Sequence, residues 1–310
     1  MGNFFQEIEE PVLLYGRDFT IGELEEIIEI IELFPSLSRQ QLAKTICENL
    51  DWQSPNGSYK LTSCDKLMLK LESEGLVTLP EKQNTNTGGK QKPIVLGPET
   101  EPPSSELGGT VSDYYPIKLE AVRDKPLRDL WNQYIERYHV LGYKRPFGAR
   151  QRYFIRAGDK DREHPLGCLL FSAAAWALSS RDEWIGWEED DRSRRLSGII
   201  NNSRFLIFPW VRVKNLASKV LSLAAKQVPE DWQQRYCYRP VLMETFVDVD
   251  SYRGTCYQAA NWIYLGQTKG RGRMDRYCEY LSSPKHIYVY PLVSDFRDYL
   301  LGNRPDWEVE

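Results

Sequence analysis

In SRFLIFPWV (203–211) and RPVLMETFVD (239–248), apolar, β-branched and aromatic residues run almost without interruption, which is typical of strands buried in a sheet. Between them, NLASKVLSLAAKQVP (215–229) spaces its apolar residues as a helix does when one face is buried. The three segments therefore predict a β-α-β unit in the larger part of the chain.

The segments around this unit predict the rest of a sheet. RQRYFIRAG (150–158) and LGCLLFSAAAW (166–176) flank the turn DKDREHP (159–165) and predict an antiparallel hairpin. LRDLWNQYIERYHVLG (127–142) predicts a helix before the hairpin, and HIYVYPLV (286–293) predicts a last strand. A hairpin combined with a β-α-β unit indicates a mixed sheet covered by helices, over residues 113–310.

The N-terminal segments predict a separate module over residues 1–80. TIGELEEIIEIIELFP (20–35) and SLSRQQLAKTICENL (36–50) each open with a capping-box spacing and continue as amphipathic helices. KLTSCDKLMLKLESEG (60–75) predicts a third helix, and LVTLP (76–80) a short strand. Three helices and a strand are the order of a winged helix-turn-helix, so the fold class is α+β with a winged-helix-like module first.

The last helix of such a module usually enters the major groove, where Lys66 and Lys70 would neutralise phosphates. The same small fold also serves in dimerisation or protein docking, and both uses stay open. Residues 81–112 are dominated by Gly, Pro, Ser, Thr and Asn, so we expect a flexible linker there.

Composition bounds the possible functions. The chain has 310 residues, of which 41% are hydrophobic, and its net charge is −4, so a polyanion must be bound by local patches and not by a global positive field. Its six cysteines contain no C-x-x-C pair and its three histidines lie far apart, so we expect no metal site and a reducing cytoplasm. The most apolar run, 166–178, is too short to cross a bilayer. No cofactor and no oligomeric state follows from the composition.

The loop RVKNLA (212–217) resembles the Q/R-x-x-G-x-G/A loop of the GNAT acyltransferases, with Arg212, Asn215 and Ala217 at the matching positions. The resemblance implies backbone N–H groups that face a pyrophosphate at a helix N-terminus, in a GNAT-like mixed α/β domain. We expect Asn215 to adopt the left-handed conformation that glycine prefers. The chain departs from the family at Trp262, four residues before Gly266, where these enzymes usually carry a tyrosine acid.

Several longer segments are similar to the DruA family of the Druantia anti-phage defence systems. That resemblance implies antiviral defence or an association with mobile elements, and it identifies no reaction. The segments are YHVLGYKRPFGARQRYFIR (138–156), PLGCLLFSAAAWAL (165–178), NNSRFLIFPWVRVKNLASKVLSLA (201–224), RPVLMETFVD (239–248) and RGTCYQAANWIYLGQTKGRGR (253–273).

Four residues are candidates for catalysis. His139 is a candidate general base or phosphate contact, because imidazole titrates near physiological pH; it is equally a cap or core filler. Glu244 and Asp248 are candidate acid-base groups on one face of a strand, and a salt bridge from Glu244 to an arginine is the alternative. Cys256 lies near a helix start, where a thiol pKa is lowered, although most isolated cysteines are buried filler.

The stretch from 246 to 273 carries the candidate nucleic-acid site. Cations alternate with glycines after a helix bearing rings and an amide, which suits phosphate contact and base stacking; the alternative is a solvated basic loop. Within this stretch the candidate residues are Tyr257, Asn261, Lys269, Arg271 and Arg273, and Arg212 and Lys214 from the earlier loop extend the patch.

Together these features predict a DNA-interacting defence protein. The alternatives are an enzyme acting on DNA, of nuclease or transposon-associated type, a GNAT-type acyltransferase, or an adaptor that recruits a helicase or transposase. The sequence leaves open whether single- or double-stranded DNA is preferred.

Overall fold

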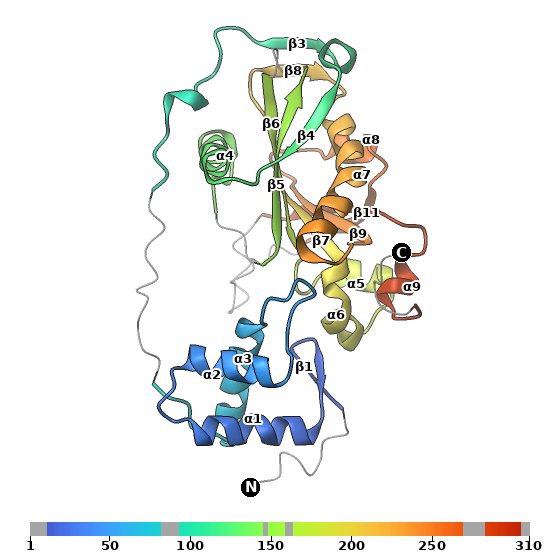
Figure 1. Ribbon diagram of the computed structural model, residues 1–310. Coiled ribbons are helices and arrows are strands. Elements are labelled where there is room, and N and C mark those ends of the chain that lie inside the picture. The colour runs from blue at the N-terminus through green and yellow to red at the C-terminus, as the bar shows by residue number, and fades with distance from the viewer. Residues whose placement is uncertain (1–10, 82–92, 145–147, 159–163, 269–282, 305–310) are drawn as a thin grey trace. The chain divides into compact units, whose positions relative to one another are not determined.

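The computed structural model describes residues 11–81, 93–144, 148–158, 164–268 and 283–304 (Figure 1). The chain divides into two compact units: Met1–Lys92 with Arg192–Arg194, and Pro93–Asp191 with Arg195–Glu310. Each unit encloses hydrophobic core residues of its own.

The smaller unit contains the hairpin β1 (Val12–Leu14) and β2 (Arg17–Phe19), followed by helices α1 (Ile21–Leu33), α2 (Arg39–Asn49) and α3 (Leu61–Ser73). Both predicted capping boxes are present. The Thr20 side chain accepts from the N–H of Glu23, and the Ser38 side chain accepts from the N–H of Gln41. These hydrogen bonds satisfy N–H groups that a helix start leaves without a partner, so both helices begin where the sequence predicts.

The strand predicted at 76–80 is wrong, because no strand is assigned to those residues. The Leu79 N–H bonds the carboxylate of Glu72 at 3.0 Å, and Arg39 donates to the Pro80 carbonyl at 2.8 Å. Side chains thus satisfy backbone groups that a ladder would otherwise pair. The hairpin of the unit instead precedes the helices, and a winged helix is not confirmed.

The larger unit is built on a seven-stranded sheet of order β10-β11-β9-β7-β6-β5-β4. The β7–β9 pair is parallel and the other neighbours are antiparallel, so the predicted mixed sheet is confirmed. The predicted hairpin is β5 with β6. The strands are β4 (Ile117–Ala121), β5 (Arg150–Ala157), β6 (His164–Ala173), β7 (Ile199–Ile207), β9 (Leu242–Asp248), β10 (Ile263–Gln267) and β11 (Lys285–Pro291).

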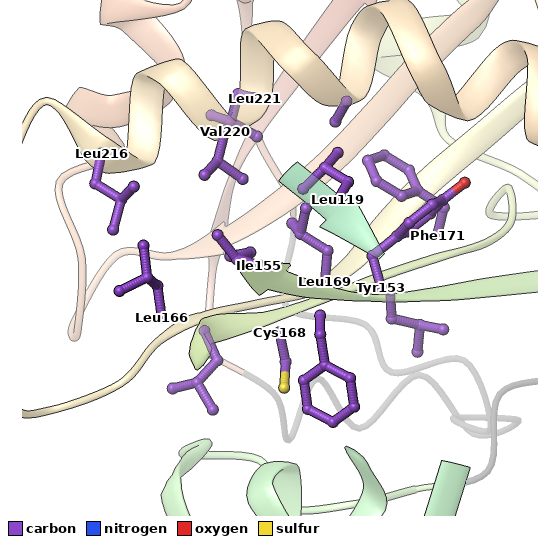
Figure 2. Close-up of a cluster of buried hydrophobic side chains, with 14 of the residues drawn as sticks. Leu119, Tyr153, Ile155, Leu166, Cys168, Leu169, Phe171, Leu216, Val220 and Leu221 are labelled. Carbon is purple, nitrogen blue, oxygen red and sulfur yellow. The ribbon is translucent and has the colours of Figure 1, made fainter. Parts of the chain in front are cut away.

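Helices cover both faces of this sheet. One face packs against α7 (Leu216–Tyr236), the helix of the predicted β-α-β unit; Figure 2 shows Leu216, Val220 and Leu221 facing Leu119, Ile155 and Leu169. The other face carries α4 (Lys125–Tyr138), whose Tyr134 ring lies 4.5 Å from the ring of Phe208, between centroids.

The remaining elements of the larger unit are short. Strand β3 (Leu107–Thr110) pairs parallel with β8 (Val211–Lys214) in a separate two-stranded ribbon. The helices are α5 (Ser179–Ile185), α6 (Glu189–Arg195, of which Arg192–Arg194 group with the smaller unit), α8 (Thr255–Ala259) and α9 (Phe296–Leu300), with short 3-10 turns η1 (Pro98–Thr100), η2 (Val111–Tyr114) and η4 (Leu196–Gly198).

The described part of the predicted linker, 93–112, holds η1 and β3. Thr100 is fully buried, its carbonyl accepts from the Tyr138 hydroxyl at 2.7 Å, and the Glu99 carbonyl accepts from the Tyr134 hydroxyl at 2.9 Å. These bonds join this part of the segment to α4.

None of the helices in the described ranges has the length and apolarity needed to cross a bilayer.

Candidate nucleic-acid interface

The β3–β8 ribbon exposes two cations on one face. On β8, buried Val211 and Val213 alternate with exposed Arg212 and Lys214. Alternation puts the two cations on the same side of the ribbon. Arg212 lies opposite Gly108 of β3, which has no side chain to cover it.

Helix α7 begins directly after β8. Asn215 has φ 62° and ψ 7°, so the predicted left-handed conformation is confirmed, and its side chain caps no N–H of the first turn. A helix N-terminus carries a partial positive charge and N–H groups without intrahelical partners. Exposed Lys219 lies one turn into the same helix. Sequence reasoning missed this residue, although its four-residue spacing from Asn215 places it beside the helix start.

Arg212 and Lys214 thus precede the start of α7, and Lys219 lies in its first turn. Within the described residues, no carboxylate forms a salt bridge with any of the three. The acidic residue in the turn after β3, Asp113, accepts from the Thr110 N–H at 2.7 Å and from its hydroxyl at 3.0 Å. Those two bonds lower the pKa of Asp113.

The ring residues of the predicted site are buried. Tyr257 and Trp262 are only 6% and 5% exposed, their rings meet edge to face at 5.1 Å, and Tyr257 also stacks on Tyr288 at 5.7 Å. The Tyr257 hydroxyl donates to the amide oxygen of Asn202 at 2.8 Å. Asn261 is exposed and has φ 61°. In this structure the rings therefore belong to the core, and Asn261 remains accessible.

Two of the other predicted cations are among the described residues, and they belong to the smaller unit. Lys269, Arg271 and Arg273 fall outside the described residues. Lys66, which is exposed, and Lys70, which is half-buried, lie on α3 of the smaller unit.

Glu244 lies at the centre of a closed hydrogen-bond network. Its side chain is fully buried, one carboxylate oxygen accepts from Arg181 at 2.8 Å, and the other accepts from the Ala175 N–H at 2.7 Å and from Asn201 at 3.4 Å. Arg181, also fully buried, pairs with Asp182 at 2.7 Å and lies over the Trp187 ring. Of the two interpretations that the sequence left open, the salt bridge is present.

Asp248 ends β9 and holds the turn that follows. Its carboxylate accepts from the Ser283 hydroxyl at 3.1 Å, the Asp250 N–H at 3.3 Å and the Ser251 hydroxyl at 3.3 Å. Four residues of extended strand separate it from Glu244 by about 13 Å. Asp248 is only half-buried, unlike Glu244. The two carboxylates therefore lie in separate environments.

His139 caps the C-terminal end of α4, and its Nδ1 accepts from the Leu141 N–H at 3.2 Å. Burial, and then the positive charge of Arg204, lower the pKa of His139 to about 4. No hydrogen bond or ion pair between described residues joins His139 to Glu244 or Asp248. No group of three or more His, Cys, Asp or Glu residues in the described ranges is placed to hold a metal ion.

The His139 environment can be measured directly. We expect a pH titration of its imidazole resonances to give a pKa of about 4, well below the usual 6.5. Because the unfolded chain takes up this proton first, the contribution of His139 to stability falls as pH decreases from about 6.5 to 4, and His139→Gln removes that slope. A titration midpoint near 6.5 would contradict the environment described.

The architecture of the chain is α+β with a large mixed sheet. The family model of the Druantia protein DruA matches residues 70–283, more than half of the chain. The chain therefore belongs to the DruA family, and this membership suggests a part in anti-phage defence. No curated protein matches it.

Two solved structures are similar in fold. A putative acetyltransferase from Sphaerobacter thermophilus DSM 20745 shares 11% identity, with 56% of this chain and 93% of that chain covered and a TM-score of 0.30. FeeM, an N-acyl amino acid synthase from uncultured soil microbes, shares 12% identity, with 57% and 92% covered and a TM-score of 0.34. The likenesses concern fold alone and say nothing of the chemistry of this chain.

Proposed function

We propose that this DruA-family chain serves anti-phage defence by binding DNA through the exposed cations of β8 and the first turn of α7. The observation that carries the proposal is that exposed Arg212, Lys214 and Lys219 flank an uncapped helix start in the chain and form no salt bridge with any described carboxylate. In a chain of net charge −4, such a local concentration of positive charge favours an anionic partner.

The chemistry of this surface suits a phosphate backbone. Arginine and lysine side chains and helix N-termini are the usual phosphate contacts, and they position a nucleic acid without reading its sequence. Lys269, Arg271 and Arg273 are proposed to add further phosphate contacts. We therefore expect weak sequence preference and strong dependence on salt.

The test is the double charge reversal Arg212→Glu with Lys214→Glu. Fluorescence anisotropy with labelled single- and double-stranded DNA should show binding by the unmodified chain that weakens as salt rises. The variant should bind at least about tenfold more weakly, and its log–log salt slope should be smaller by about 1 for each phosphate that the protein no longer neutralises.

Lys226→Glu is the matched control, since exposed Lys226 lies on the same helix seven residues, or about 10 Å, beyond Lys219. It should retain most of the affinity. Equal affinity of the double variant and the unmodified chain, or binding unaffected by salt, would refute the proposed surface.

A second function is favoured by one observation, the left-handed Asn215 in the loop that resembles the GNAT pyrophosphate loop. For this second function, the backbone N–H groups at the start of α7 would bind the pyrophosphate of an acyl-coenzyme A. Calorimetry with coenzyme A and acetyl-coenzyme A should then show heat that Arg212→Glu reduces. Absence of heat with both ligands would remove this candidate.

A helicase or transposase partner is also proposed. Co-purification of the tagged full-length chain from cells that carry its neighbouring genes should recover such a partner, and repeated recovery of the chain alone would argue against it.

A further inference from the structure

Two arginines lie on the sheet face that also carries α4, on the two strands that flank β6. Arg152 of β5 and Arg204 of β7 are both register partners of Leu170 in the intervening strand β6. Register partners point to the same face, and two strand spacings separate the Cα atoms by about 10 Å. Side chains as long as arginine can therefore approach one ligand from both sides.

Arg152 is buried without a full set of partners. It is 8% exposed, its Nη2 donates to the Tyr143 hydroxyl at 3.2 Å, and its guanidinium lies 5.3 Å from the centre of the Trp131 ring. Its Nε is buried and has no hydrogen-bond partner. The buried N–H of a charged group ordinarily has a hydrogen-bond acceptor, and the Nε–H of Arg152 lacks one.

Arg204 is half-buried, and its only hydrogen-bond acceptor in the described chain is the Ser203 carbonyl, at 2.6 Å. Its charge acts on His139, the residue at the end of α4. The half-buried side chains of Arg204, His139 and Tyr143 place this part of the face partly in solvent.

Glu136 and Glu244 are bonded to groups other than these two arginines. Glu136 accepts from the Tyr143 N–H at 2.7 Å, and Glu244 is bound by Arg181. No carboxylate of the described ranges forms a salt bridge with Arg152 or Arg204. Arg156, on the same strand as Arg152, shows the usual arrangement, since it pairs with Glu120 at 2.9 Å.

Burial lowers the pKa of both Arg152 and Arg204, because a charged guanidinium loses solvation there. Two desolvated positive charges without a counter-charge are costly, and an anion from outside the chain would offset that cost.

We infer that Arg152 and Arg204 bind the phosphate group of a ligand, with the Tyr143 hydroxyl and His139 at its edge. A phosphate monoester carries a charge of about −1.5 to −2 and three acceptor oxygens, which matches two guanidinium groups better than a single carboxylate does. The inference does not depend on the proposed DNA surface, which uses other residues.

The first experiment titrates the full chain with inorganic phosphate at constant ionic strength, with chloride as the comparison. Phosphate should raise the thermal unfolding temperature, because a ligand that binds the folded state stabilises it. It should also raise the pKa of His139 from about 4, since the anion offsets the charge of Arg204. If neither quantity changes, the inference is overturned.

The second experiment compares Arg152→Met and Arg204→Met with Arg156→Met. Each of the first two should weaken phosphate binding about tenfold or more, since each removes charged hydrogen bonds, and should leave the ligand-free unfolding temperature unchanged or higher. Arg156→Met should bind phosphate normally and unfold at a lower temperature. Unchanged phosphate affinity in both Arg152→Met and Arg204→Met would contradict the inference.

The source of the phosphate is tested with adenosine monophosphate and with one oligonucleotide, with and without a 5′-phosphate. Tighter binding of the mononucleotide than of inorganic phosphate supports a nucleotide ligand. A gain from the 5′-phosphate that Arg204→Met removes supports a DNA end. DNA affinity abolished by Arg212→Glu with Lys214→Glu, while phosphate still shifts the His139 pKa, shows that the two sites are separate.

Discussion

Glu244→Ala should lower the free energy of unfolding of the larger unit by about 2–5 kcal/mol. The substitution leaves the fully buried Arg181 without its 2.8 Å partner, and it leaves the Ala175 N–H without its acceptor. Arg181 keeps its pair with Asp182 at 2.7 Å, so the loss comes from buried donors that no longer have an acceptor and from the space that the side chain leaves. Urea denaturation followed by tryptophan fluorescence measures the change.

Two controls define the result for Glu244. Glu120→Ala breaks the more exposed pair with Arg156 and should cost only about 0–1 kcal/mol. Arg181→Met should cost at least as much as Glu244→Ala, because it leaves both Glu244 and Asp182 without their partner at 2.8 and 2.7 Å. Unchanged stability of Glu244→Ala together with loss of a DNA-dependent activity would instead support the catalytic hypothesis for Glu244.

Gly254→Ala should destabilise the same unit by about 2–5 kcal/mol. Gly254 precedes α8 with φ +70°, and an added Cβ would lie 2.6 Å from the Tyr288 hydroxyl oxygen and 2.8 Å from its ring. Tyr288 is 1% exposed and stacks on Tyr257, so the ring has little room to move. The backbone strain and the clash therefore add, and urea denaturation measures their sum.

Gly186→Ala separates the two contributions. Gly186 has φ +86° at the end of α5, with no atom within 4 Å of an added Cβ. The Gly186→Ala substitution should lower the free energy of unfolding by about 1–2 kcal/mol, which is the cost of the left-handed backbone alone. Equal losses for the two alanine variants would mean that the Tyr288 ring does not confine Gly254.

Local patterns were enough to predict much of the fold. The capping boxes at Thr20 and Ser38, the hairpin of β5 and β6, and the left-handed Asn215 depend on residues close together in the chain, and all are present. The hairpin of β1 and β2 was not predicted, although Tyr15 and Gly16 between its strands both have positive φ. Only three residues on each side leave too short a pattern for alternation to be recognised.

The candidate site was less predictable. Aromatic residues near 257–262 suggested base stacking, but composition does not distinguish a ring on the surface from one in the core. The structure buries Tyr257 against Tyr288, which lies 31 positions further along the chain and pairs with β9 and β10. Whether the Tyr257 ring lies in the core or on the surface therefore depends on how β11 pairs with β9 and β10.

By itself the sequence determined the three helices of the smaller unit, the starts of α1 and α2, the β5–β6 hairpin, the mixed sheet and the chain's resemblance to its family, because each rests on short-range spacing or on whole segments. Only the tertiary structure decided which charges are neutralised. Glu244 meets Arg181 across 63 positions, whereas Arg152 and Arg204, placed on one face by their pairing with β6, form no salt bridge with a carboxylate in the described ranges. Charge pairing is set by distances of a few ångströms between strands that are remote in sequence, and these exist only after the sheet has formed.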